Sequence, residues 1–164
     1  MSTRPVTAPF SAEHAELKKH LGHIQKMIGD LAAAASPARR RTMETVVAFL
    51  NDHIRPHAEW EERVLYPLVD RHAGGSREPF TATMRHEHRI VGRWIEELAH
   101  EAARSQPDVW AFSRRSDNLL GLLAAHFEEE EEVLLPILEQ VMTPEEFQRE
   151  VMDRAEHHSQ GRRE

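Results

Sequence analysis

The chain has 164 residues, 40% of them hydrophobic and 30% charged, with 28 acidic residues against 21 lysines and arginines for a formal net charge of −7. That length fits a single domain with its own core, and the absence of cysteine excludes disulfides, thiolate metal ligands and thiol nucleophiles. The negative charge argues against a nucleic-acid surface, no apolar run approaches the roughly 18 residues of a membrane span, and residues 1–9 lack the apolar core of a signal peptide. We therefore expect a cytoplasmic protein with no nucleic-acid or membrane partner.

Stretches rich in alanine, leucine, glutamate and arginine, separated by short polar or glycine-containing segments, predict five helices. Ser11 is a candidate N-cap for the first helix, and Ser36 followed by proline opens the second. Gly74 lies in the loop after the second helix, and Thr143 with Glu146 fits a capping box that opens the fifth. The expected helices span 11–34, 37–71, 80–104, 107–140 and 144–156.

Four long helices with short connections favour an all-α protein, an up-down-up-down four-helix bundle followed by a short fifth C-terminal helix. We expect the bundle and its C-terminal helix to occupy residues 10–156. A flexible N-terminal segment (1–9) would precede it, and a disordered polar tail (157–164) would follow.

The first and third predicted helices each carry an apolar stripe at the alternating three- and four-residue spacing of a bundle seam. Each stripe includes one histidine near its N-terminal end, His14 in the first helix and His88 in the third, and the two differ by 74 positions. The stripes are Phe10, His14, Leu17, Leu21, Ile24, Ile28 and Leu31 in the first helix, and Met84, His88, Val91, Ile95, Leu98 and Ala102 in the third.

The second and fourth helices repeat each other at an offset of 69 residues. HAEWEERVLYP (57–67) aligns with HFEEEEEVLLP (126–136), and both copies hold a histidine, a glutamate four residues later, and then Val, Leu and Pro at equal spacings. Residues four apart share one face of a helix. His57 with Glu61, and His126 with Glu130, therefore each present an imidazole and a carboxylate to the bundle interior.

Antiparallel geometry brings these groups together. Within each predicted hairpin the two histidines lie at similar chain distances from the connecting loop, 21 and 21 residues in the first hairpin and 17 and 19 in the second. At about 1.5 Å per residue they reach the same level of the core. Six buried polar groups are costly without compensation, and two adjacent metal ions bridged by the carboxylates would supply it. Imidazole with carboxylate suits iron, and zinc or manganese less distinctly.

The combined pattern resembles the hemerythrin-like (HHE cation-binding) domain over about residues 10–140. The resemblance implies a non-haem centre of two iron ions with an oxo or hydroxo bridge. It also implies that the carboxylates bridge the two ions and that the histidines are terminal ligands. The metal-ligand set that the resemblance implies is His14, His57, Glu61, His88, His126 and Glu130.

The sequence departs from oxygen-carrying hemerythrins at two places. Those proteins have a histidine pair, HxxxH, on the third helix, but Met84 and Gly92 lie four residues to either side of His88. One nitrogen ligand is therefore missing unless His86 or water replaces it. The carriers also place the last carboxylate five residues after its histidine, which would be Glu131. The internal repeat favours Glu130, although a π-bulge in the fourth helix would turn Glu131 inward.

Other polar residues near the predicted site have more ordinary interpretations. We expect His53 to lie inward as packing or as a support for the ligands, and His86 to face solvent. Tyr66 is expected in the core, with coordination of ferric iron as the alternative. Three prolines inside helices (Pro56, Pro67 and Pro136) are expected to kink them. Most of Glu62, Glu87 and Glu129 to Glu132 should be solvated, with one or two orienting ligand imidazoles.

A centre that lacks one ligand leaves a position for a small molecule. We therefore expect a di-iron protein that binds or reacts with O₂, hydrogen peroxide or NO. Peroxide consumption (a catalase-like activity) or redox sensing fits better than O₂ transport. One alternative is an iron-sensing or iron-holding module without turnover, and another is a metal-free or zinc-stabilised helical interaction domain. We expect a monomer or a weak homo-oligomer.

Overall fold

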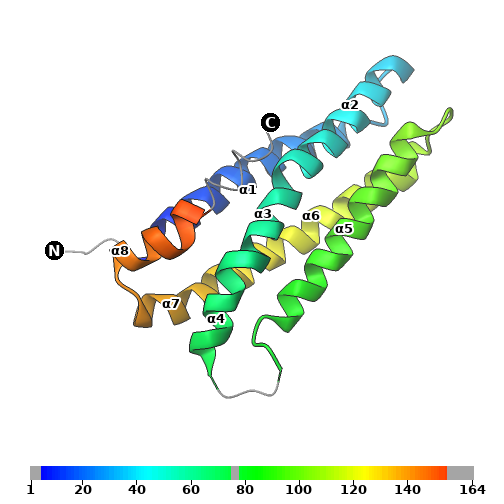
Figure 1. The fold of residues 1–164 in the computed structure, drawn as a ribbon. Coiled ribbons are helices and arrows are strands. Elements are labelled where there is room, and N and C mark those ends of the chain that lie inside the picture. Colours follow the sequence, from blue (N-terminus) through cyan, green and yellow to red (C-terminus); the bar gives the residue numbers. More distant parts are fainter. Residues whose placement is uncertain (1–4, 75–77, 155–164) are drawn as a thin grey trace, which may run out of the picture.

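The computed structural model describes residues 5–74 and 78–154, and within these ranges all regular structure is helical. Four long helices pack as a bundle, and a short C-terminal helix folds back beside its first and second helices (Figure 1). This confirms the predicted all-α bundle. The predicted tail, residues 157–164, and the first four residues lie outside the described part of the chain.

Two of the long helices contain wide π-helical turns (η). The first and third are regular, and the second and fourth are built from consecutive α and π segments. The elements are α1 (Ala8–Gly29); α2 (Ser36–Phe49), η1 (Leu50–Ile54), α3 (Arg55–Trp60), η2 (Glu61–Leu65) and α4 (Tyr66–Ala73); α5 (Ala82–Ala103); α6 (Val109–Glu129), η3 (Glu130–Leu134) and α7 (Leu135–Val141); α8 (Pro144–Phe147) and η4 (Gln148–Met152).

The π-helical turns of the second and fourth long helices occur next to internal prolines. Segments η1, η2 and η3 each end two residues before a proline, respectively Pro56, Pro67 and Pro136. Proline has no N–H and its ring clashes with the carbonyl four residues earlier. A wider turn shifts the hydrogen-bonding partner by one residue, so the chain stays helical through each proline. Glu61 and Glu130 are the first residues of two of these turns.

Several helix ends differ from the sequence prediction because tertiary contacts determine them. The first helix begins at Ala8 instead of Ser11, and it ends at Gly29 instead of residue 34. Thr7, which precedes it, is buried, and its hydroxyl donates to Glu139 Oε1 at 2.6 Å. The predicted N-cap Ser36 is instead the first residue of its helix, and Ala35 occupies the N-cap position. The capping box of Thr143 and Glu146 is confirmed.

The core consists of two apolar clusters separated by a layer of polar side chains. One cluster includes Leu21, Ile24, Ile95 and Leu123. The other includes Phe10, Trp60, Leu65, Tyr66 and Leu138, and it extends to Phe147 and Val151 of the C-terminal helix. The Trp60 indole N–H donates to the Val151 carbonyl at 3.3 Å, so this helix covers the bundle end. Within the described residues, no helix combines the length and apolar character needed to cross a bilayer.

Candidate metal centre

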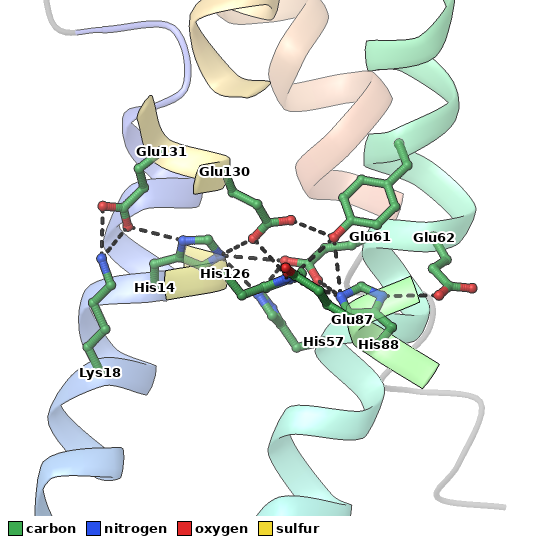
Figure 2. Close-up of polar contacts among 11 residues, drawn as sticks. His14, Lys18, His57, Glu61, Glu62, Glu87, His88, His126, Glu130 and Glu131 are labelled. Carbon is green, nitrogen blue, oxygen red and sulfur yellow. Dashed lines mark hydrogen bonds and ion pairs between the residues drawn. The ribbon is translucent and has the colours of Figure 1, made fainter. Parts of the chain in front are cut away.

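The polar layer between the two apolar clusters contains the four predicted histidines, and their Nε2 atoms converge in two pairs. His14 Nε2 lies 3.1 Å from His57 Nε2, and His88 Nε2 lies 3.0 Å from His126 Nε2 (Figure 2). Side-chain exposure is 0% for His14 and 7% for His88, with the other two between these values. The first pair comes from α1 and α3, and the second comes from α5 and α6.

Two fully buried carboxylates lie between the histidine pairs. Glu61 Oε1 is 2.7 Å from His57 Nε2, while Glu61 Oε2 is 3.2 Å from His88 Nε2, so this side chain faces both pairs. Glu130 Oε2 is 3.4 Å from His14 Nε2 and 3.7 Å from His126 Nε2. All six predicted residues thus meet in one layer, as the chain-distance argument required.

The donor atoms form two groups, each compact enough for one metal ion. The first consists of His14, His57, Glu61 and Glu130, and the second of Glu61, His88 and His126; within each group the donor atoms lie within 4.8 Å of one another. Glu61 belongs to both groups because its two oxygens face opposite sides. The groups are unequal, with four residues in one and three in the other.

The structure places Glu130, and not Glu131, in the interior. Glu130 is 0% exposed, whereas the Glu131 side chain is 29% exposed and accepts a hydrogen bond from His14 Nδ1 at 3.1 Å. The π-helical turn η3 does exist, but it begins at Glu130. Glu130, its first residue, already faces inward, so the turn does not rotate Glu131 into the core.

Outer carboxylates hold three of the four imidazoles by their Nδ1 atoms. Glu131 pairs with His14, Glu62 pairs with His88 at 3.1 Å, and Glu87 pairs with His126 at 2.8 Å. Such pairing fixes the ring and leaves Nε2 free as a donor to metal. The fourth Nδ1, that of His57, is buried without a hydrogen-bond partner.

Sequence reasoning expected one or two orienting carboxylates and did not anticipate Lys18. The Lys18 ammonium donates to both oxygens of Glu131 at 2.8 Å, which extends the chain of contacts from His14 to the surface (Figure 2). Lys18 lies one helical turn after His14, so its position on the same face was the available signal.

Tyr66 directly contacts the layer formed by the six predicted ligands, called the metal-ligand layer from here on. Its buried hydroxyl donates to Glu130 Oε1 at 2.7 Å and lies 3.2 Å from His88 Nε2 and 3.4 Å from His126 Nε2. Sequence reasoning favoured a core role for this residue. A usable signal was present in the repeat, because Tyr66 aligns with Leu135 and is thus a polar group in only one copy.

The electrostatics of the layer distribute protons unequally. Burial lowers the pKa of His57, but the Glu61 carboxylate more than reverses this, so that pKa is raised overall; burial lowers the pKa of His126. Burial disfavours the charge on Glu61, yet the surrounding imidazoles hold its pKa well below the usual range. For Glu130, burial and then the Glu61 charge raise the pKa well above the usual range. Burial followed by both carboxylates also raises the pKa of Tyr66.

The residues present fit a pair of metal ions. Glu61 Oε2 and Glu130 Oε2 are buried and make no hydrogen bond, which is a costly arrangement for carboxylate oxygens. Both face neighbouring imidazole nitrogens that are less than 4 Å away. A cation bound between these oxygens and nitrogens would satisfy them together, and imidazole with carboxylate is a donor set typical of iron, manganese or zinc.

His53 and His86, the two histidines considered as further ligands or supports, lie outside this layer. The inward position predicted for His53 is wrong, because its side chain is exposed and stacks on exposed His20, with ring centroids 6.5 Å apart. The widened turn η1 includes His53 and changes its direction relative to a regular helix. His86 is exposed, as expected, and cannot replace the missing ligand near His88.

Comparison with protein families agrees with this geometry. Residues 6–138 match the family described as Hemerythrin HHE cation binding domain. The chain belongs to this family. Searches of curated proteins and of solved structures gave no match. Membership in the HHE family and the two buried groups of histidine and glutamate together establish a cation-binding domain with a site suited to metal.

Proposed function

We propose that this HHE domain is a non-haem di-iron protein that binds or reacts with O₂ or reactive oxygen and nitrogen species. Its activity would be hydrogen peroxide consumption or redox sensing, and not O₂ transport. Iron is favoured over zinc because imidazole and carboxylate oxygen dominate the donor set, and because no cysteine is available in the chain.

The inequality of the two donor groups is the observation that carries the proposal. The group around His88 has three residues against four in the other group, and the side chain one turn before His88 is Met84, a buried apolar residue. An ion held by fewer protein ligands keeps more positions for a small molecule. This favours reaction at the His88 side over a protected, saturated carrier centre.

Iron would supply the change of oxidation state, and the chain's own residues would control protons and water. The Tyr66 hydroxyl holds a proton next to Glu130 and within 3.2 Å of His88 Nε2. The two apolar clusters on either side of the layer shield it from bulk water along the bundle axis. Disproportionation of two hydrogen peroxide molecules to O₂ and two waters needs no further oxidant, so such a site can complete it alone.

The test measures iron content and the optical spectrum before and after addition of hydrogen peroxide. We expect two irons per chain, an iron-dependent absorption, and peroxide loss that His126→Ala abolishes. His53→Ala is the matched control, because it removes an exposed histidine from the second long helix and should leave all three readouts unchanged. If chelation of the metal changes neither the spectrum nor the unfolding temperature, the proposal is wrong.

The burial of the site supports a second candidate function, that of an iron-holding or iron-sensing module without turnover. His14, Glu61 and Glu130 are all 0% exposed, which would slow exchange of a bound ion. Two irons per chain with no loss of added peroxide, together with slow removal of iron by a chelator, would select this alternative.

A further inference from the structure

A groove leads from the surface to the His88 side of the metal-ligand layer. It has a volume of about 260 Å³ and lies between α3 and α5, where Arg55, Glu62, His88 and Gly92 contribute to its walls. His88 is the most exposed of the four predicted histidine ligands. On the other side of the layer, His14 is fully buried, with the rings of Phe10 and Phe127 at centroid distances of 4.5 and 4.6 Å.

Gly92 keeps this groove open. A Cβ atom built at Gly92 would have Arg55 Nη1, 4.0 Å away, as its nearest neighbour, so the position has room for a side chain that the sequence does not provide. Gly92 lies one helical turn after His88 on the same face of α5. A larger residue there would extend into the groove beside the His88 ring.

The internal repeat shows what a side chain does at the equivalent place. The offset of 74 residues that relates His14 to His88 also relates Lys18 to Gly92, and the offset of 69 relates Glu62 to Glu131. In the first half, Lys18 binds Glu131, the carboxylate that holds His14. In the second half, Glu62 holds His88, but no side chain at position 92 can cover it.

The groove walls carry balanced charge. Arg55 and Arg89 line it together with Glu59 and Glu62. The Arg55 guanidinium is engaged by Asn51 Oδ1 at 3.0 Å, by the Gly92 carbonyl at 3.5 Å and by Glu96 at 3.7 Å. The entrance thus presents no net charge that would attract an anion, which favours an uncharged ligand.

We propose that this groove admits small uncharged ligands such as NO, O₂ or hydrogen peroxide to the metal beside His88, and that Gly92 sets its width. The proposal rests on the proposed function. Gly92 is a specificity-determining residue here, since it limits by size what reaches the centre without contacting the metal itself.

The experiment uses NO as the probe on iron-loaded, reduced protein, with stopped-flow absorption to measure the binding and dissociation rates. Gly92→Leu adds bulk, and Gly92→Lys reproduces the repeat-related lysine opposite Glu62. We expect both rates to fall by about tenfold or more while the Kd stays unchanged, because an obstructed path slows entry and exit alike. The matched control is Gly121→Leu, an exposed glycine on α6 with nothing within 4 Å of a built Cβ.

The possible outcomes distinguish failure of the groove proposal from failure of the proposed function. Removal of glycine from a helix interior favours folding, so neither Gly92 variant should unfold at a lower temperature than the parent. If iron-loaded parent protein binds NO and both variants bind it at the parental rate, the groove is not the route. A changed Kd or resting spectrum in both variants would also overturn the proposal, because Gly92 would then act on the centre itself. If the parent binds no iron, the proposed function fails instead.

Discussion

The two halves of the metal-ligand layer share one pattern of donors but differ in their surroundings. Each half has two imidazoles, one on each helix of a hairpin, and an inward glutamate four residues after the second of them. The His14 side is closed by Phe10 and by the Lys18–Glu131 pair. On the His88 side, Met84 stands at the position related to Phe10, and Gly92 stands at the position related to Lys18. A groove reaches the His88 ring on this side. The repeated residues thus provide symmetric donors, and the unrepeated residues decide which donor group is accessible from the surface.

The largest expected effect distinguishes the two glutamates of the layer. Glu61→Ala should weaken binding of both metal ions, because Glu61 belongs to both donor groups, and should affect the His88 group most, since only two of its residues remain. Glu130→Ala should weaken only the ion beside His14 and His57, which keeps three of its four residues, and should leave the His88 group complete. Metal analysis after dialysis checks the stoichiometry. Equal loss in the two variants would contradict the unequal division of the ligands.

The next prediction compares outer carboxylates at repeat-related positions. Glu87 Oε2 lies 2.8 Å from His126 Nδ1. Glu13 is the repeat-related residue, 74 positions earlier, but it makes no hydrogen bond to His57, because the Nδ1 of His57 has no partner. Glu87→Gln should weaken metal binding about 10- to 100-fold, the usual cost of losing such a partner. Glu13→Gln is the matched control and should change the affinity little. Competition with a chelator measures both, and similar losses would show that Glu13 moves to His57 when metal binds.

Tyr66→Phe tests the polar group that only one repeat carries. The change removes the hydroxyl that donates to Glu130 Oε1 and leaves that buried oxygen without its donor. We expect the metal-free protein to lose about 1–2 kcal/mol in free energy of unfolding, measured by urea denaturation. In the iron-loaded variant, an altered absorption would place the phenol oxygen next to the metal. An unchanged unfolding free energy would mean that Glu130 is satisfied in some other way.

The smallest expected effect concerns the covering of the His14 side. Glu139 accepts hydrogen bonds from the backbone of Val6 and Thr7, residues that lead into Phe10. Burial opposes its charge, but the hydrogen bonds from the Thr7 hydroxyl and from these two backbone N–H groups together hold the pKa of Glu139 below its usual value. The stabilisation is therefore complete above the unfolded-state pKa of about 4.3 and is lost as the pH falls through the lower folded-state pKa.

Glu139→Gln should accordingly cost about 1 kcal/mol at pH 7, a value reduced by solvent screening. The difference between variant and parent should shrink as the pH falls below 4. Urea unfolding at both pH values measures it. A difference that persists unchanged in acid would show that the carboxylate charge does not hold residues 6 and 7.

The sequence by itself determined the bundle, the six converging residues and their chemical character. A helical period of 3.6 residues assigns each position to a face, and antiparallel hairpins bring positions at equal distance from a loop to one level. For this reason the sequence alone was enough to assign His14, Glu61 and His126 to one layer of the core. The repeat also favoured an inward Glu130 over Glu131, because His126 and Glu130 share one face, and Glu130 is the one that lies buried.

Only the tertiary structure decided what surrounds those residues. The pairing of Lys18 with Glu131, the reach of the Tyr66 hydroxyl and the groove beside Gly92 all depend on side chains of neighbouring helices. The outward turn of His53 depends on a wide turn that adjusts the helix to Pro56. A periodic pattern specifies the direction of a residue from its own helix axis. It does not specify which side chains of other helices meet it, and those contacts make two similar half-sites unequal.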